Sequence, residues 1–145
     1  MTQPSFVDTS VWVAYFDRSD KDHPVFKTCL PRVVGGNEWR LHTSDYVIDE
    51  TATFLRYHTN HATACVALDR FRDLAAAQLL VCHSVDSALR LRAESIFRQY
   101  QDQSFSFTDC TSFVLCQAHE LRHVVTCDSD FRLFGLLLVP EDVSP

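Results

Sequence analysis

The stretch Ser5-Phe6-Val7-Asp8-Thr9-Ser10-Val11-Trp12-Val13-Ala14-Tyr15-Phe16 joins two apolar runs through one acid and two hydroxyl residues. The first run, which ends at Asp8, predicts a short buried strand. Asp-Thr-Ser is typical of a helix N-terminus, because these side chains accept hydrogen bonds from free backbone N–H groups. The run from Val11 to Phe16 fits a strand or a helix by periodicity alone, and the preceding cap favours a helix.

The rest of the chain continues this alternation of short apolar runs and longer helical stretches. We expect further strands at residues 40–43, 79–82, 124–126 and 136–139, and further helices at residues 22–34, 45–58, 60–77, 86–101 and 107–120. A short α-helix is expected before the last strand, and Asn60 and Ser106 are expected helix caps. This order predicts a single α/β domain with a parallel sheet over residues 1–140, followed by a polar C-terminal tail at residues 141–145.

Composition excludes several classes of protein. The three glycines, at positions 35, 36 and 135, cannot form the nucleotide-binding patterns G-x-G-x-x-G or G-x-x-x-x-G-K. No apolar run approaches the ~18–20 residues that span a bilayer, and the N-terminus does not resemble a signal peptide. We therefore expect a cytoplasmic protein with no membrane association. The net charge of −6 argues against a general nucleic-acid binder, but it suits a cluster of acids that holds cations.

The six cysteines are expected to be free thiols. No C-x-x-C pair occurs, and the chain is long enough to build a core without disulfides. We expect most of these cysteines to fill the core.

Four acids stand where a carboxylate needs an explanation. Asp8 and Asp128 follow predicted strands, and ligands of open α/β sheets bind at the carboxyl ends of the strands. Asp109 lies in the first turn of a predicted helix on an inward face, and Glu50 lies at the edge of an apolar helix stripe. Each has an ordinary alternative, a helix or turn cap for the aspartates and a solvated position for Glu50. Gathered together, they would repel one another unless cations lay between them, and oxygen ligands favour Mg²⁺ or Mn²⁺.

These acids fall in motifs that follow one another along the whole chain. The motifs are Phe6-Val7-Asp8-Thr9-Ser10, Thr43-Ser44-Asp45-Tyr46-Val47-Ile48-Asp49-Glu50-Thr51, Ser106-Phe107-Thr108-Asp109 and Val125-Thr126-Cys127-Asp128-Ser129-Asp130-Phe131, with Leu138-Val139-Pro140 closing the domain. In this order and spacing the chain resembles the PIN-domain nucleases, specifically the VapC-type toxins of toxin–antitoxin pairs. The resemblance implies a single PIN-like domain whose parallel sheet carries helices on both faces.

The resemblance also implies a site and a reaction. The acids of the family fall by position on Asp8, Glu50, Asp109 and Asp128, as catalytic and metal-binding residues, with Thr9 supporting the site and Asp130 as a further acid near the fourth position. The implied activity is endonucleolytic hydrolysis of RNA by water, with one or two Mg²⁺ or Mn²⁺ ions as cofactors. The implied partners are an RNA substrate, a small cognate antitoxin that places a basic side chain into the acidic site, and a second copy in a homodimer.

Contacts to RNA phosphates would fall mainly to arginine, because Lys21 and Lys27 are the only lysines. Arg90, Arg92 and Arg98 lie on one predicted helix. A solvated helix face is the simpler interpretation of that helix.

Two other interpretations remain open at this point. His119-Glu120-Leu121-Arg122-His123 has the zinc-site form H-E-x-x-H, but it spans a predicted helix end near residue 120, where the two histidines would diverge. Alternatively, the chain is a PIN fold that mainly binds a partner protein, with a weak or idle site, through an exposed apolar face at residues 11–16 or 45–58. The presence of all four acids favours the enzyme.

Overall fold

A computed structural model describes residues 3–35 and 39–139 of the chain. The stretch quoted first folds as predicted, with strand β1 (Gln3–Val7) leading through Asp8 into helix α1 (Thr9–Phe16). Asp8 is the N-cap of α1, and its Oδ1 accepts a hydrogen bond from the Thr9 backbone N–H at 2.8 Å. The cap therefore ends the strand and starts the helix at one residue.

The remaining elements follow the predicted order. They are α2 (His23–Gly35), β2 (Trp39–Ser44), α3 (Asp45–His58), α4 (His61–Ala76), β3 (Leu80–His83), α5 (Ser87–Gln99), α6 (Phe107–Ala118), β4 (His123–Val125), η1 (Ser129–Phe134) and β5 (Leu137–Val139). Asn60 caps α4 and Ser106 caps α6, which confirms both predictions. The predicted tail at residues 141–145 and the domain end at residue 140 lie outside the described residues.

One predicted element differs in type. The segment before the last strand was expected to be a short α-helix, and it is the 3₁₀-helix η1. Asp128 caps its start, and Gly135, with φ of 74°, ends it after six residues. A segment this short, closed at both ends, favours the tighter 3₁₀ geometry.

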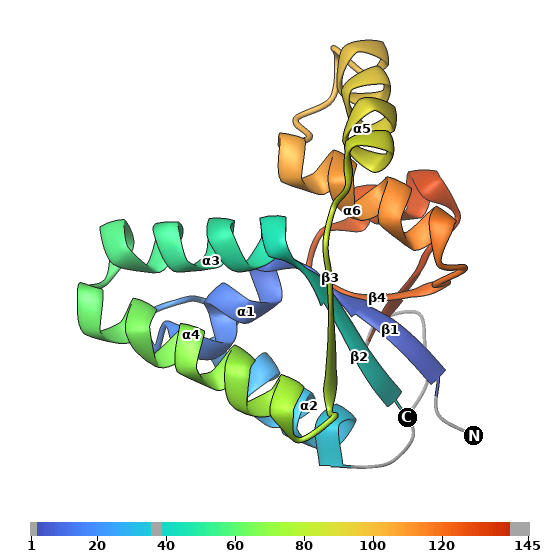
Figure 1. Cartoon of the computed structure of the whole chain (residues 1–145). Helices are drawn as coiled ribbons and strands as arrows, with labels where there is room; N and C mark the ends of the chain where they lie inside the picture. Colours follow the sequence, from blue (N-terminus) through green and yellow to red (C-terminus); the bar gives the residue numbers. More distant parts are fainter. Residues whose placement is uncertain (1–2, 36–38, 140–145) are drawn as a thin grey trace.

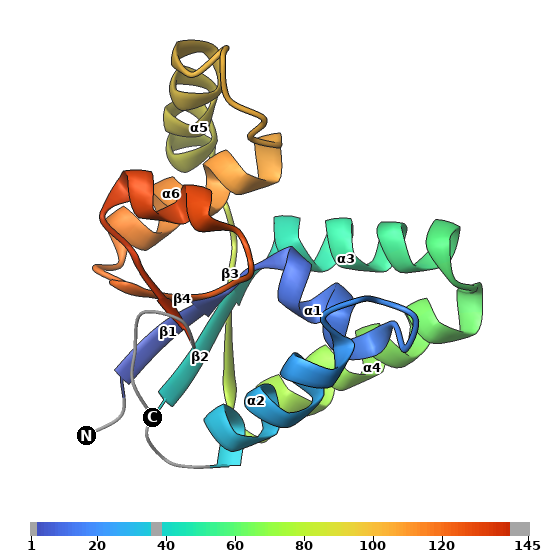
Figure 2. The same cartoon turned by 180° about the vertical axis from the view of Figure 1, so that it is seen from behind.

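The sheet has five parallel strands in the order β3-β2-β1-β4-β5. The chain builds outward from β1 to β3 and then returns to the other side of β1 with β4, so the strand order reverses between β1 and β4. Figure 1 shows α1–α4 on one side of the sheet and α5 and α6 on the other, and Figure 2 shows the same layers from behind. The expected α/β fold with helices on both faces is confirmed.

Each face of the sheet carries its own aromatic core. On the side of α1–α4, Trp12 is fully buried and meets Phe71 edge-on, with ring centroids 4.8 Å apart. On the other side, Phe113 stacks on Phe134 at 4.0 Å and meets Phe131 edge-on at 4.9 Å. The central strand β1 lies between these two cores, so its carboxyl end and the residue that follows it are firmly placed.

Helix α5 packs mainly on α6 and projects away from the sheet (Figures 1 and 2). Of its residues only Ala93 is fully buried. Phe97 lies one turn after Ala93 in an apolar stripe of this helix, yet it is 48% exposed, and Leu91 is 56% exposed. The α5 surface therefore carries apolar side chains that the core does not use.

The cysteine prediction is confirmed in one part and wrong in another. None of the six cysteines forms a disulfide. However, only Cys110 and Cys116 are buried, whereas Cys82 and Cys127 are exposed. Cys82 lies on the edge strand β3, and Cys127 follows β4.

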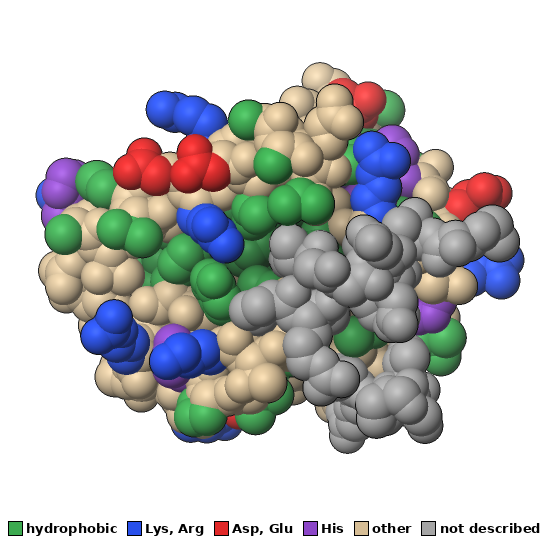
Figure 3. Space-filling model, turned by 90° about the horizontal axis from the view of Figure 1, so that it is seen from below, with side chains coloured by type: hydrophobic (Ala, Val, Ile, Leu, Met, Phe, Trp, Pro, Cys, Tyr) green, Lys and Arg blue, Asp and Glu red, His purple; other side chains and the backbone are tan. Residues whose placement is uncertain are grey.

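The surface mixes charges of both signs with apolar side chains. Figure 3 shows the molecule from below, and on that face the lysine and arginine side chains stand singly rather than in one basic stripe. Within the described part of the chain, no helix combines the length and apolar character that crossing a membrane requires.

Candidate active site

Asp8 is held at the carboxyl end of β1 by hydrogen bonds to both of its carboxylate oxygens. Oδ1 accepts from the Thr9 backbone N–H at 2.8 Å, and Oδ2 accepts from the Ser10 hydroxyl at 2.8 Å and the Thr126 hydroxyl at 2.9 Å. The Asp8 N–H donates to the Val125 carbonyl oxygen of β4 at 3.1 Å. These bonds orient the Asp8 carboxylate at the point where the strand order reverses, which is where open α/β sheets bind their ligands.

The Asp8 carboxylate is almost completely buried, with 4% of the residue exposed. Its pKa is raised to about 6, mainly by burial and in small part by the charge of Asp128, while the hydrogen bonds from Ser10, Thr126 and Thr9 oppose the rise. A positive charge beside this carboxylate would favour its ionised form.

The hydroxyl groups that hold Asp8 are not the one that the resemblance suggested. Thr9 contributes its backbone N–H, and among the described residues its buried Oγ1 has no hydrogen-bond partner. Ser10 and Thr126 supply the hydroxyls instead, and sequence reasoning assigned them no role. Ser10 lies two residues after Asp8, a local signal that was available. Thr126 lies 118 residues away, and only the pairing of β1 with β4 brings it close.

Asp109 lies in the first turn of α6 within a capping box. The Ser106 hydroxyl accepts from the Asp109 N–H at 3.0 Å, and Asp109 Oδ2 accepts from the Ser106 N–H at 3.1 Å. The pKa of Asp109 is raised to about 7, mainly by burial and also by the charges of Asp8, Glu50 and Asp128, against the Ser106 hydrogen bond. The capping interpretation is therefore correct but incomplete, because Asp109 also lies within electrostatic reach of the other three predicted acids.

Asp128 follows β4 and is linked to Asp8 through a shared hydroxyl. The Asp128 N–H donates to Thr126 Oγ1 at 3.0 Å, and the same Thr126 hydroxyl donates to Asp8. Asp128 also caps η1, with its Oδ1 accepting from the Asp130 N–H at 2.9 Å. Asp128, and not Asp130, is among the charges that raise the pKa of Asp8 and of Asp109. The structure therefore favours Asp128 as the fourth acid.

We call Asp8, Glu50, Asp109 and Asp128 the acidic cluster. Their carboxylate oxygens are donors that fit a hard divalent cation. Carboxylate oxygens are the ligands that Mg²⁺ and Mn²⁺ prefer, and a cation favours the ionised form of acids that raise one another's pKa. Within residues 3–35 and 39–139, however, no three or more histidine, cysteine, aspartate or glutamate side chains already stand in an arrangement that could hold a metal ion. Asp8, Glu50, Asp109 and Asp128 would therefore have to draw together around a cation.

The H-E-x-x-H stretch does not form a zinc site on one helix. Helix α6 ends at Ala118, His119 is its C-cap, and Glu120 adopts a φ of 54°. His123 begins β4. The prediction that the two histidines diverge is confirmed.

His119 instead joins two other histidines over β2 and β3, and we call His42, His83 and His119 the histidine cluster. His42 Nδ1 and His83 Nε2 are 2.7 Å apart, and the rings of His83 and His119 have centroids 4.3 Å apart. The pKa of His42 is lowered to about 4, mainly by burial and also by His83, Arg40 and His119. Burial and His119 also lower the pKa of His83. These two neutral imidazoles belong to the packing of the fold.

Residues 5–135 match the model of the PIN domain family. The match spans most of the chain, including the four acids of the cluster. The chain therefore belongs to the PIN domain family.

Within this family the chain is similar to VapC proteins along nearly its whole length. It is 26% identical over 134 residues to the 23S rRNA-specific endonuclease VapC20 of Mycobacterium tuberculosis, covering 92% of this chain and 96% of that protein. A VapC ribonuclease of Archaeoglobus fulgidus is 24% identical over 131 residues, covering 89% of this chain and 80% of that protein. The crystal structure of VapC20, described as a Sarcin-Ricin loop cleaving toxin, matches with a TM-score of 0.76 and 25% identity, covering 90% of this chain and 95% of that chain. The resemblance to VapC-type PIN proteins is confirmed.

Proposed function

We propose that the chain is a divalent-metal-dependent endoribonuclease that hydrolyses RNA phosphodiester bonds, and that it is the toxin of a toxin–antitoxin pair. The observation that carries this proposal is that Asp8, Glu50 and Asp128 lie within electrostatic reach of Asp109, so that their charges raise its pKa. Acids crowded in this way are unfavourable without a cation, so the arrangement is explained by binding one. Membership of the PIN family and the names of the relatives support the same activity.

The role we propose for the acidic cluster is to hold and position metal ions, and the bound ions would supply the chemistry. Its four carboxylates would hold one or two Mg²⁺ or Mn²⁺ ions, which when bound activate water and neutralise the charge that develops on the phosphate. Asp8 is held by three hydrogen bonds to its carboxylate, and Asp109 is held by the cap of α6. Attack by water does not require a lysine, histidine or cysteine nucleophile.

The substrate we propose is a structured RNA. Water as the attacking group needs no 2′-hydroxyl, so the reaction by itself does not select RNA over DNA. The preference for RNA rests on the relatives, of which VapC20 is named for 23S rRNA and described as cleaving the Sarcin-Ricin loop. An RNA hairpin with that loop is therefore the first substrate to test.

The proposed partners are a small antitoxin and a second copy of the chain, in the cytoplasm. The antitoxin would place a basic side chain among the four carboxylates, because a cation there relieves the same repulsion that a metal relieves. A complex in which the antitoxin touches none of Asp8, Glu50, Asp109 and Asp128 would contradict this arrangement.

The experiment that tests the function is cleavage of a structured RNA by the purified, antitoxin-free protein. It compares Mg²⁺, Mn²⁺, Zn²⁺ and EDTA, with Asp8→Asn measured alongside. We expect cleavage with Mg²⁺ or Mn²⁺ that EDTA abolishes and that Asp8→Asn lacks. No cleavage by a folded sample of wild type under any of these conditions would overturn the proposal.

The second candidate function is a PIN fold that mainly binds a partner protein. On α3, Tyr57 is 78% exposed and Phe54 is 38% exposed, and Val66 on α4 is 58% exposed. These apolar side chains favour a protein contact on that side of the molecule. The other surface considered from the sequence, residues 11–16, is mostly buried and does not provide one. A protein contact there is compatible with the nuclease, since a toxin also has a partner.

A further inference from the structure

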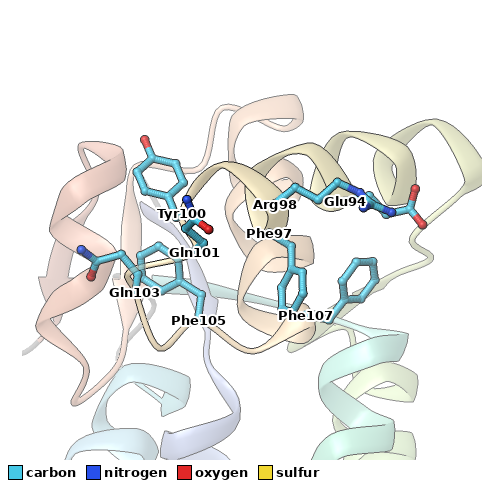
Figure 4. A pocket seen from close by; sticks show the side chains of 8 residues that line it. All are labelled: Glu94, Phe97, Arg98, Tyr100, Gln101, Gln103, Phe105 and Phe107. Atoms are coloured by element: carbon cyan, nitrogen blue, oxygen red, sulfur yellow. The ribbon is translucent and has the colours of Figure 1, made fainter.

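A pocket of about 580 Å³ lies between α5 and the start of α6. Figure 4 shows the ring of Phe97, from α5, beside the ring of Phe107, from the first turn of α6, with Arg98 and Glu94 on α5 above them. The amides of Gln101 and Gln103, from the turn between the helices, also line the pocket. Its volume is in the range of small-molecule sites, and its lining combines aromatic faces with a few polar groups.

The pocket adjoins the acidic cluster through one aromatic side chain. The ring of Phe107 lies 5.9 Å from the ring of Phe97 and 6.2 Å from the ring of Tyr46, between centroids. Tyr46 precedes Glu50 by four residues on α3, so the two share a face one turn apart. Phe107 itself lies two residues before Asp109 on α6. The aromatic rings therefore continue the junction of α3 and α6 at which the acids gather.

We infer that this pocket holds an unpaired base of the RNA substrate, stacked on the exposed ring of Phe97 beside Phe107, next to the phosphate that is cleaved. This inference rests on the proposed nuclease function and names what its substrate must offer. Proteins read single-stranded and looped RNA by stacking unpaired bases on aromatic rings. Phe97 is 48% exposed, as a stacking surface requires.

The polar lining specifies the ligand further. Arg98 is exposed on α5 and offers guanidinium donors to a flanking phosphate, which is the strongest kind of polar contact to RNA. The Glu94 carboxylate only accepts hydrogen bonds when ionised, so it suits a base that turns an N–H donor toward it. The pocket therefore suits a base extruded from an RNA loop with its donor edge toward Glu94.

The binding test uses Asp8→Asn protein in Mg²⁺, so that the RNA is not cleaved, and a hairpin RNA that carries 2-aminopurine at each loop position in turn. We expect quenching of the probe at one position, because the base stacks on the rings. Phe97→Leu in the same background keeps an apolar side chain but removes the aromatic face, and it should weaken binding on the order of tenfold, as for one lost base–aromatic stack. Phe97→Trp should restore binding. Leu91→Ala, at an exposed apolar position of the same helix outside the pocket, is the matched control and should bind as the parent does.

Cleavage by the otherwise wild-type protein gives an independent test. Phe97→Leu should raise KM for the hairpin with little change in kcat, since the stack is present before and during the reaction. Equal quenching and equal KM in Phe97→Leu and its parent would overturn the inference, while metal-dependent cleavage would leave the nuclease function standing. Position-specific quenching that Phe97→Leu removes, together with no cleavage by wild type in any metal, would support the base pocket and overturn the nuclease.

Discussion

Two groups of ionisable side chains lie over the same sheet. They differ in whether their members can satisfy one another's hydrogen bonds. The acidic cluster lies by β1 and β4, and the histidine cluster lies on β2, on β3 and at the end of α6. A neutral imidazole has one nitrogen that donates and one that accepts, so two histidines satisfy each other, as the 2.7 Å contact between His42 and His83 shows. Ionised carboxylates only accept, so four of them cannot.

The difference separates a packing feature from a functional site. Burial and neighbouring charged groups lower the pKa of His42 to about 4 and lower the pKa of His83, so these two imidazoles are neutral at neutral pH without any ligand. Burial and the charges of neighbouring acids raise the pKa of Asp8 to about 6 and of Asp109 to about 7, and a bound cation would offset both shifts. Crowded groups that cannot satisfy one another mark the place where a ligand belongs.

The largest difference between the two clusters is expected in the rate of RNA cleavage. Asp8→Asn keeps an oxygen that can cap α1 but removes the negative charge, and we expect the cleavage rate to fall a hundredfold or more, beyond the ~10–100-fold typical of an outer-shell partner. His42→Gln, in the other cluster, should change the rate less than about twofold, because nothing in the reaction needs it. Initial rates on one RNA hairpin measure both. Asp49→Asn, next to Glu50 but exposed, controls for loss of a nearby charge.

The next largest effect is expected where a hydroxyl holds the acidic cluster together. Thr126→Val keeps the size of the side chain and removes the bond to Asp8 and the acceptor for the Asp128 N–H, so we expect activity to fall roughly 10–100-fold. Thr9→Val is the matched control, because among the described residues the Thr9 hydroxyl has no hydrogen-bond partner. The measurements are kcat/KM and the Mg²⁺ concentration for half-maximal activity. Equal losses in the two variants would show that the Thr126 hydroxyl has no special role.

A smaller effect is expected on stability at the acidic cluster. The folded protein holds protons on Asp8 and Asp109 up to pH values of about 6 and 7, whereas an unperturbed aspartate, with a pKa of 3.8, has released its proton well below that pH. Raising the pH from about 4 to 8 therefore removes stability from the metal-free protein. Asp109→Asn keeps an oxygen acceptor for the Ser106 N–H and carries no charge, so it should be more stable than wild type at pH 8 by about 1 kcal/mol.

Urea denaturation in EDTA at pH 4, 6 and 8 tests this expectation. The advantage of Asp109→Asn should be present at pH 8 and absent at pH 4. Saturating Mg²⁺ should stabilise wild type more than the variant, because it binds the folded carboxylates. A variant less stable than wild type at pH 8 without metal would mean that the carboxylates are not crowded in solution.

The smallest effect on stability is expected at the histidine cluster. There, stability is lost as the pH falls, whereas at the acidic cluster it is lost as the pH rises. The folded protein keeps His42 neutral down to a pH of about 4, whereas an unperturbed histidine takes up a proton near pH 6.5. Stability is therefore lost as the pH falls from 7 to 4. His42→Gln cannot take up this proton, so between pH 7.5 and 5 its stability should improve relative to wild type by a few tenths of a kcal/mol, since His42 is only partly buried. Thermal melts at the two pH values measure this, and an unchanged difference would exclude a shifted pKa.

Local patterns predicted the elements of the fold well, whereas the four acids were assigned by the order of motifs that resemble the PIN family. Asp8, Asn60 and Ser106 were predicted as caps, and each accepts a hydrogen bond from a backbone N–H one to three residues away. Bonds of such short range depend on residue type and spacing alone. The alternation of strands and helices is equally local, which is why the α/β order was predicted with only η1 of the wrong type.

Other features were decided only by tertiary structure. Thr126 reaches Asp8 across 118 residues and His83 reaches His42 across 41, and the order of strands in the sheet makes both contacts. Phe97 belongs to an apolar stripe, yet it stays at the surface because α5 packs on α6 and not on the sheet. The sequence by itself therefore determined which residues cap helices and which segments form strands and helices. Long-range packing decided which of them meet, because it depends on the simultaneous burial of several elements that no short segment specifies.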